Sequence, residues 1–407
     1  MTYSKDHVFF KNPARAYPKK ESLLDDLTLS ELAFYFVMFY NILGPKLGLV
    51  VGDVGGGFLM MIVLAIWFME GRENFASVMR QTYLLLGCGV AYIVIQLVIH
   101  EESSTHAYVR PYPVWVFSLI VVHGLVGRKN FFHRFAIVTI LLGLAMAPYI
   151  KVLAGGKGFQ RMGLERGVGF ANPNDLGQYY GFCTLYLTIA GFAARETRIR
   201  VFFWLLALGG FFFTTLTVSR SPLVSMVASL MIAFRHLLKE GILTLIALLC
   251  LVLAAVLLGV FDVALQSYGA RADEETGRLT IWPLLIERIG NSPLIGVGVS
   301  YVETYTPTGF AITPHNGVLL IAAASGIVPA ALFIGHWIKA AKAALYTTGN
   351  NLPGSAFHLP LLTYAFLTMN SGNLVFMAPW SIVCLALPFA PSVNSVGCAN
   401  WRKRTAD

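Results

Sequence analysis

The sequence predicts an all-α polytopic membrane protein with about 12 transmembrane helices. Hydrophobic residues make up 56% of the 407-residue chain and charged residues only 13%, whereas a soluble protein carries about 25% charged residues. Apolar runs close to the roughly 20 residues that cross a bilayer recur between residues 30 and 391. No linker or low-complexity tract divides the chain, so we expect one helical bundle.

The expected spans follow one another with short connections except at one place. In chain order they are residues 30–50, 54–70, 82–99, 112–127, 134–153, 175–193, 201–217, 222–236, 241–261, 315–336, 356–370 and 373–391. The exception is a long loop over residues 262–312, and a loop of that size in a compact protein is usually functional. Inside it, helical spacing predicts a short amphipathic helix that carries Trp282, Leu285, Ile286 and Ile289.

Basic residues predict that both termini face the cytosol. The loops expected on that side carry Arg72, Arg80, Arg128, Lys129, Arg134, Arg195, Arg198, Arg200, Arg235, Lys239, Lys339 and Lys342. Residues 1–29 are then a cytosolic tail without the apolar core of a cleavable signal, residues 30–391 form the transmembrane domain, and residues 392–407 form a second cytosolic tail. Because the net charge of +9 falls mostly in short loops, it fits membrane topology better than nucleic-acid binding.

A second set of basic residues falls on the opposite, outer face, where the charge bias predicts few. It comprises Lys46, Arg110, Lys151, Lys157, Arg161, Arg166, Arg220, Arg271, Arg278 and Arg288. Three helix starts share that face, at residues 172–175, 219–222 and 313–316, each with a capping residue and a proline. Because helix N-termini carry partial positive charge, these starts and the arginines together predict an anion site.

His315 is the candidate general base. We expect Thr313 to cap the helix that follows and Pro314 to occupy its first turn. The field of the helix dipole disfavours an imidazolium ion there, so a neutral imidazole is available to accept a proton. A histidine at a helix start can also be a simple cap or polar anchor.

Arg220 lies between two expected spans that only a few residues separate. Its guanidinium can clamp a diphosphate in a bidentate manner, or it can anchor the helix by reaching the lipid headgroups. Ser219 and Ser221 would add hydroxyl donors, and Arg278 could act in the same way from the long loop.

Weaker candidates lie on the loops of the same face. Arg161 and Arg166 flank a glycine-rich segment before Asn172, and Arg110 precedes a proline. Each can equally be a solvated loop cation. The chain has no histidine–glutamate pair and no cysteine cluster at the spacing of metal ligands, so no metal site is expected.

Four segments of the chain resemble the bacterial O-antigen ligase and polymerase superfamily. They are residues 170–174, residues 217–221, Gly277-Arg278 with Trp282 and residues 293–298, and Pro314-His315-Asn316 with Leu319 and Gly326. The resemblance covers roughly residues 167–329, and the first five spans are similar in topology. It implies a multi-pass, GT-C-type glycosyltransferase of the Gram-negative inner membrane with a periplasmic site and an undecaprenyl-diphosphate-linked glycan as donor.

The resemblance also implies roles for individual residues. His315 matches the general base, Arg220 and Arg278 match the arginines that hold the diphosphate, and Asn316 would orient His315 or a sugar. No cofactor and no metal is implied. The full set of expected substrate-binding residues is Arg161, Arg166, Asn172, Asn174, Ser219, Ser221, Asn316 and Arg110.

Three functions remain open at this point. A ligase passes the glycan to the lipid A–core oligosaccharide, and the histidine-centred segment is most similar to ligases. A polymerase passes it to another lipid-linked repeat. A transporter for an anionic lipid would need polar residues at mid-membrane, and the expected spans are almost free of charge at their centres. The expected partners are therefore the lipid-linked donor, lipid A–core and membrane lipids, with no nucleic acid.

Overall fold

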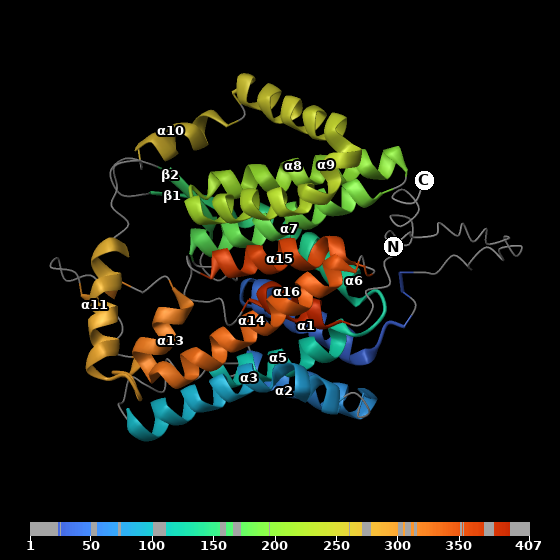
Figure 1. Ribbon diagram of the computed structural model, residues 1–407. Coiled ribbons are helices and arrows are strands. Elements are labelled where there is room, and N and C mark those ends of the chain that lie inside the picture. The colour runs from blue at the N-terminus through green and yellow to red at the C-terminus, as the bar shows by residue number, and fades with distance from the viewer. Residues whose placement is uncertain are drawn as a thin grey trace, which may run out of the picture.

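The structure is a computed structural model in which helices pack side by side in layers (Figure 1). It describes residues 23–24, 26–49, 55–71, 75–100, 111–154, 160–165, 172–194, 196–259, 261–270, 278–299, 304–305, 311–312, 316–350, 352, 354–369 and 378–390. The chain is mostly helical, as predicted. Two short antiparallel hairpins, β1–β2 and β3–β4, were not anticipated.

The longer helices overlap the predicted spans, although several of their bounds differ. They are α1 (Leu29–Leu43), α2 (Gly55–Gly71), α3 (Phe75–Val94), α5 (Pro111–Val126), α6 (Phe131–Met146), α7 (Pro173–Ala193), α8 (Thr197–Leu216), α9 (Arg220–Leu257), α14 (Ile327–Gly349) and α15 (Ser355–Thr368). Shorter helices are α10 (Asp262–Ala270), α11 (Arg278–Asn291), α13 (Gly317–Ser325) and α16 (Pro379–Ala386). Single turns are η1 (Pro45–Leu47), η3 (Ile95–Ile99), η4 (Ala147–Tyr149) and η6 (Leu387–Phe389).

Apolar helices of membrane-crossing character are present. Within the described part of the chain, Phe75–Ile99, Phe131–Tyr149 and Thr197–Leu216 are each long and apolar enough to cross a bilayer alone. Shorter apolar helices cover Leu29–Leu43, Gly57–Gly71, Val114–Val126 and Pro379–Phe389. These helices indicate a membrane protein, and the total of about 12 spans stays a prediction.

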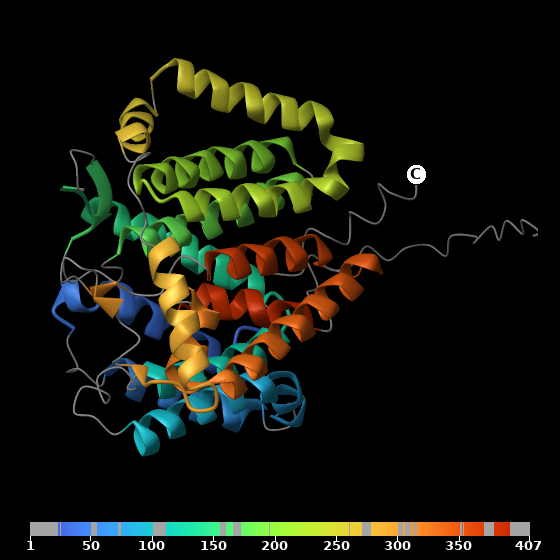
Figure 2. The ribbon, with the colours of Figure 1, turned by 60° about the vertical axis from the view of Figure 1, so that its left-hand side comes forward.

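Three details differ from the predicted spans. The eighth and ninth are one helical run, α9, whose ribbon turns back on itself (Figures 1 and 2). The fifth ends at Met146, because Pro148 lies in the single turn η4 and the chain then enters β1 (Ile150–Ala154). The tenth is broken at Gly326, which has a φ of +85° that side-chain-bearing residues rarely adopt.

Helix α7 is the centre of the bundle. Nearly its whole length, from Asp175 to Gly191, is buried. Its tyrosine hydroxyls donate to α6, from Tyr179 to the carbonyl of Thr139 (2.5 Å) and from Tyr180 to that of Gly143 (2.8 Å). Because α8, α9 and α15 also pack on it, the start of α7 is held firmly with respect to the rest of the bundle.

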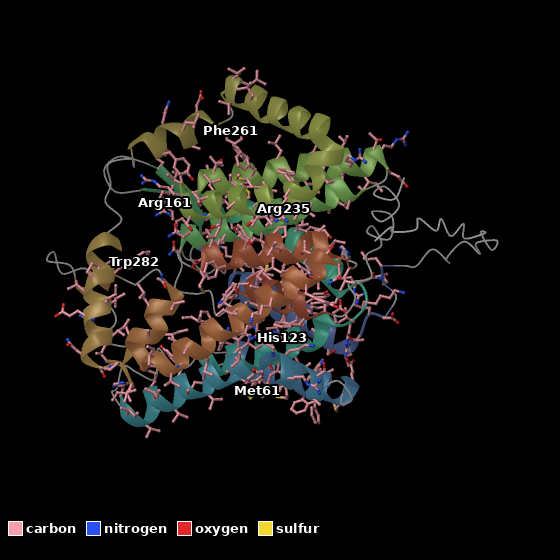
Figure 3. The ribbon with its side chains drawn as sticks, viewed as in Figure 1. Met61, His123, Arg161, Arg235, Phe261 and Trp282 are labelled. Atoms are coloured by element: carbon pink, nitrogen blue, oxygen red, sulfur yellow. The ribbon has the colours of Figure 1, made fainter. Side chains whose placement is uncertain are left out.

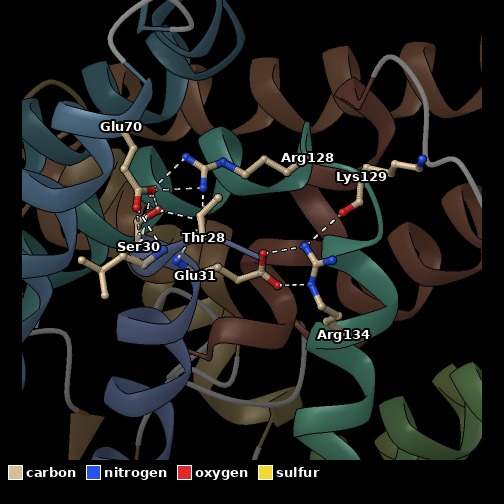
Figure 4. A network of polar contacts seen from close by, with 8 residues as sticks. Thr28, Ser30, Glu31, Glu70, Arg128, Lys129 and Arg134 are labelled. Carbon is tan, nitrogen blue, oxygen red and sulfur yellow. Dashed lines mark hydrogen bonds and ion pairs between the residues drawn. The ribbon is translucent and has the colours of Figure 1, made fainter. Parts of the chain in front are cut away.

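The bundle has two chemically different ends. At the Arg134 end, where α6 begins, Arg134 forms a bidentate ion pair with Glu31, with Nε–Oε1 2.6 Å and Nη2–Oε2 2.7 Å (Figure 4). Next to it, Glu70 accepts hydrogen bonds from the backbone N–H groups of Leu29 and Ser30 at the start of α1 and from Arg128. The hairpin end, opposite in Figure 1, carries β1–β2, α11 and the starts of α7, α9 and α13.

The predicted amphipathic helix of the long loop is present as α11. Ile281 and Leu285 are buried, and α11 packs against α13. Ile286, which we expected on the packing face, is 60% exposed, because it lies about 100° around the helix from Leu285. The loop also holds α10, whose preceding residue Phe261 is buried against the rings of Phe211 and Phe212 on α8.

Candidate functional site

The first part of the site is the start of α7. Asn172 caps the helix, because its Oδ1 accepts a hydrogen bond from the backbone N–H of Asn174 (2.9 Å), and Pro173 follows at the first helical position. The predicted cap is therefore confirmed. Its effect is to place the Asn174 side chain at the mouth of the helix, within the partial positive charge of the N-terminus.

The second part is Arg161 on strand β2 (Gln160–Leu164), which pairs antiparallel with β1. Arg161 donates from Nη2 to Asn174 Oδ1 (2.9 Å) and Ser219 Oγ (3.1 Å), and from Nε to the carbonyl of Thr217 (3.1 Å). A solvated loop cation would not make these contacts, so that reading of Arg161 is wrong. The guanidinium instead ties the hairpin to two helix starts. Figure 3 labels Arg161 at this end of the bundle.

The third part is the tight turn between α8 and α9. Val218 has a φ of +51°, which is strained for a β-branched residue. This conformation lets Ser219 face α7, where its hydroxyl donates to Asn174 Oδ1 (2.6 Å). Tyr268 on α10 braces the turn by donating to the carbonyl of Ser219 (3.2 Å).

Arg220 and Ser221 begin α9 directly after this turn. Arg220 is exposed and Ser221 is half-buried. An arginine at a helix start opposes the usual preference for acidic residues there. Arg161 bonds to Ser219, the residue directly before Arg220, so both arginines lie at the starts of α7 and α9.

The start of α13 differs in register from the prediction. The helix begins at Gly317, and its cap is Asn316, whose Oδ1 accepts from the backbone N–H groups of Val318 (3.0 Å) and Leu319 (3.1 Å). The expected capping by Thr313, with Pro314 in the first turn, is wrong. An asparagine oxygen satisfies two free N–H groups at once, and it takes the cap position.

The starts of α13 and α7 are both fastened to the end of α15. The backbone N–H of Gly317 donates to the carbonyl of Met369 (3.3 Å), and Gln178 on α7 donates to that of Thr368 (3.4 Å). Tyr364 returns a hydrogen bond to the carbonyl of Gln178 (2.7 Å). All three predicted helix starts thus belong to one connected cluster.

The structure describes some of the predicted site residues and does not describe others. Arg161, Asn172, Asn174, Ser219, Arg220, Ser221 and Asn316 lie at this end as described above. His315, Arg166 and Arg110 lie outside the described residues. Arg278 begins α11, and its side chain lies outside the described part as well.

The sequence reading missed Asp175 as a site residue. Its side chain is only 9% exposed, in the first turn of α7. On a helix, position 175 points between positions 178 and 179, and these contact α15 and α6, respectively. The carboxylate therefore faces the interior beside the end of α15. A signal was present, because a carboxylate three residues after the cap still lies in the first turn, and it faces inward when the helix is buried all round.

Part of this cluster lies in a region that matches a family model. Residues 201–334 match the O-antigen ligase family, Wzy_C. About a third of the chain is therefore similar to this family. The family consists of membrane enzymes that transfer glycans, both ligases and polymerases. The matched region begins within α8 and ends within α14, so it includes the α8–α9 turn, α10, α11 and α13.

The matched region contains only part of the cluster. Arg220, Arg278, His315 and Asn316 fall inside the matched residues, whereas Arg161, Asn174 and Asp175 lie before them. A comparison with curated proteins gave no match. Packing of β2 and α7 on the α8–α9 turn therefore adds residues to the site that the family match does not reach.

Proposed function

We propose that this protein is an O-antigen ligase. It transfers a glycan from undecaprenyl diphosphate to the lipid A–core oligosaccharide at the periplasmic face of the Gram-negative inner membrane. The observation that carries the proposal is the pair Arg161 and Arg220 beside the starts of α7 and α9, inside or next to the region that matches the ligase family. Positive helix ends and guanidinium groups are what a diphosphate requires.

In the proposed reaction His315 is the general base. Its neutral imidazole takes the proton from an acceptor hydroxyl, and the oxygen attacks the anomeric carbon of the donor. The bond from that carbon to the diphosphate breaks at the same time, so the configuration inverts and undecaprenyl diphosphate leaves. Arg220 and Arg278 stabilise the charge that develops on the departing oxygen, which is the kind of interaction that contributes most in such sites.

The residues around the two helix starts have supporting roles. Asn174 Oδ1 already accepts from Arg161 and Ser219, so its amide Nδ2 is turned away from them. In the proposal Nδ2 donates to a diphosphate or sugar oxygen, and Asp175 accepts a hydrogen bond from a sugar hydroxyl. Arg161 contributes charge and also fixes the positions of Asn174 and Ser219.

The reaction can be tested with purified protein in lipid nanodiscs. Undecaprenyl-diphosphate glycan is supplied either with lipid A–core or alone, with EDTA present and ATP absent. We expect glycosylated lipid A–core in the first mixture and no change in the second. A ladder of longer glycans from the donor alone indicates a polymerase instead, and a requirement for added divalent metal contradicts the proposed mechanism.

The general base can be tested with His315→Ala in the same assay. We expect turnover to fall by at least about 10²-fold, at the lower end of what general-base catalysis supplies. Donor binding should stay within about threefold, because the diphosphate is held by the arginines. His315→Ala with unchanged turnover would sink the assignment of the base while leaving the ligase activity itself in place.

A further inference from the structure

Gln96 forms a polar junction at the end of α13, beside the break at Gly326. It is fully buried and lies on η3, a π-helical turn that extends α3. Such turns are rare and occur frequently at functional sites. The amide of Gln96 uses both ends, because Nε2 donates to the carbonyl of Ala324 (2.7 Å) and to Ser325 Oγ (2.8 Å), while Oε1 accepts from the backbone N–H of Val299 (2.9 Å).

These partners lie on two different segments. Ala324 and Ser325 end α13, just before the break at Gly326, and Val299 lies in the segment that follows α11. That segment, residues 292–299, also bonds to the break directly. The N–H groups of Val297 and Gly298 donate to the carbonyls of Ala323 (2.8 Å) and Ala324 (3.1 Å).

The residues after the break also bond to the segment 292–299. The N–H of Ile327, at the start of α14, donates to the carbonyl of Pro293 (2.8 Å). A side chain at Gly326 would collide with the carbonyl of Leu294. The free carbonyls that a helix end always exposes are thus satisfied by one neighbouring segment and one glutamine.

The junction links the far ends of two elements that carry proposed site residues. Helix α11 begins at Arg278, and α13 follows directly on the His315–Asn316 pair. Both are short and rigid, and they pack on each other. A shift where α13 ends is therefore transmitted to where it begins. A displacement of about 1 Å at a reacting group can lower a rate by 10²-fold.

We propose that Gln96 is a positioning residue for glycan transfer. Its amide locks the end of α13 to the segment after α11, and this fixes the catalytic start of α13 relative to Arg278. The inference rests on the proposed function for its catalytic consequence. The lock itself is a property of the fold that can be measured without activity.

The test compares Gln96→Met with Thr82→Val. Methionine keeps the length of the side chain but has no amide. Thr82 is equally buried on α3, and among the described residues its hydroxyl bonds within its own helix, to the carbonyl of Val78 (2.7 Å). Thr82→Val therefore removes one buried polar group from the same helix without touching the junction.

Two readouts are needed. In hydrogen–deuterium exchange, we expect residues 292–299 and 320–327 to exchange at least about tenfold faster in Gln96→Met than in wild type, and to be unchanged in Thr82→Val. In the transfer assay, we expect kcat to fall at least about tenfold in Gln96→Met, while the KM for donor stays within about threefold. Gln96→Asn, which retains an amide one methylene shorter, should lie between Gln96→Met and wild type, and it replaces Gln96→Met if that variant does not fold.

The outcomes separate the two proposals. Unchanged exchange at the junction, or a kcat loss equal to that of Thr82→Val, overturns the positioning role. A loss that appears wholly in the KM for donor overturns it too, because it indicates a binding defect. If wild-type protein transfers no glycan, the proposed function fails, and the exchange data still decide whether Gln96 locks the junction.

Discussion

The two ends of the bundle differ in the charged residues that lie at their helix starts. At the Arg134 end, the start of α1 meets carboxylates, with Glu31 in its first turn and Glu70 bonded to its N–H groups. This arrangement is what the helix dipole favours. At the hairpin end, arginines lie beside the starts of α7 and α9, and Arg161 donates to three neutral oxygens.

The difference indicates what each end is for. At the Arg134 end, Arg134 and Arg128 are each paired with a carboxylate, and these pairs stabilise the fold. The hairpin end places Arg161 and Arg220 next to the starts of α7 and α9, with Asp175 buried in the first turn of α7, and it includes a strained Val218. Proteins tend to break such local rules at functional sites. Under the proposed function, a diphosphate bound at the hairpin end would place its negative charge beside these arginines and helix starts.

The largest expected effect follows from breaking the Arg134 end. Arg134→Met leaves the Glu31 carboxylate buried without its partner; the Arg134 and Glu31 side chains are 4% and 0% exposed. Removing one member of a buried pair costs about 3–5 kcal/mol, so we expect a large fall in the midpoint of thermal unfolding in detergent. The double variant Glu31→Gln/Arg134→Met should recover much of that loss. A single variant as stable as wild type would contradict the assigned role.

At the hairpin end, we expect a substitution to lower activity more than stability. Arg161→Ala removes the group that positions Asn174 and Ser219, and we expect kcat/KM to drop by about 10²-fold, similar to the loss of one oxyanion donor. Arg161→Lys keeps the charge but not the planar fork, so its value should be intermediate.

A control for this comparison lies on the same hairpin. Lys151 on β1 carries the same charge, is 59% exposed and pairs with Glu165. Lys151→Met should leave kcat/KM within about threefold. Equal losses in Arg161→Ala and Lys151→Met would mean that only overall charge matters at this end.

Asp175 tests whether buried charge at the hairpin end serves function or fold. Asp175→Asn keeps the shape and removes a buried charge, so stability should not fall. We expect kcat/KM to drop by about tenfold, because a hydrogen bond to a charged acceptor is worth about 1.5–3 kcal/mol. Lower stability with unchanged kcat/KM would make Asp175 a structural residue.

Some features of the structure can be predicted from a few residues that are adjacent in the sequence, and others cannot. The cap at Asn172 was predictable, because capping depends on a few adjacent residues. The contacts of Arg161 with Asn174 and Ser219 were not, because they join segments 13 and 58 residues apart. Gly326 in an apolar run was a readable sign of the helix break.

The hairpin β1–β2 was missed for a physical reason. Residues 150–154 are mostly apolar and continue the hydrophobic run of α6, so hydropathy alone could not separate strand from span. Its lysine also gains a partner, because Lys46 and Lys151 both pair with Glu165, at 3.1 and 3.0 Å. Two of the outer cations that the sequence left unexplained thus have a structural reason.

The smallest expected effect concerns this Lys46–Glu165–Lys151 cluster and its pH dependence. Hydrogen bonds from Lys151 and Lys46 hold the pKa of the Glu165 carboxyl below its usual range. Because the unfolded chain then binds the proton more readily than the folded one, the stabilisation is complete above the ordinary glutamate pKa of about 4.3. It is lost as the pH falls through the lowered value.

The protection factors of the hairpin amides, Ile150–Ala154, measured relative to the intrinsic exchange rate at each pH, should therefore fall slightly on acidification below about pH 4.3 in wild-type protein. Glu165→Gln should show the lower protection factors already at neutral pH, with a flatter pH profile, because the glutamine cannot titrate. Since the cluster is exposed, screening keeps the effect small, and added salt should reduce it further. An identical acid response in both proteins would show that Glu165 does not hold the hairpin, and Arg161 would then depend on its own three hydrogen bonds for its position.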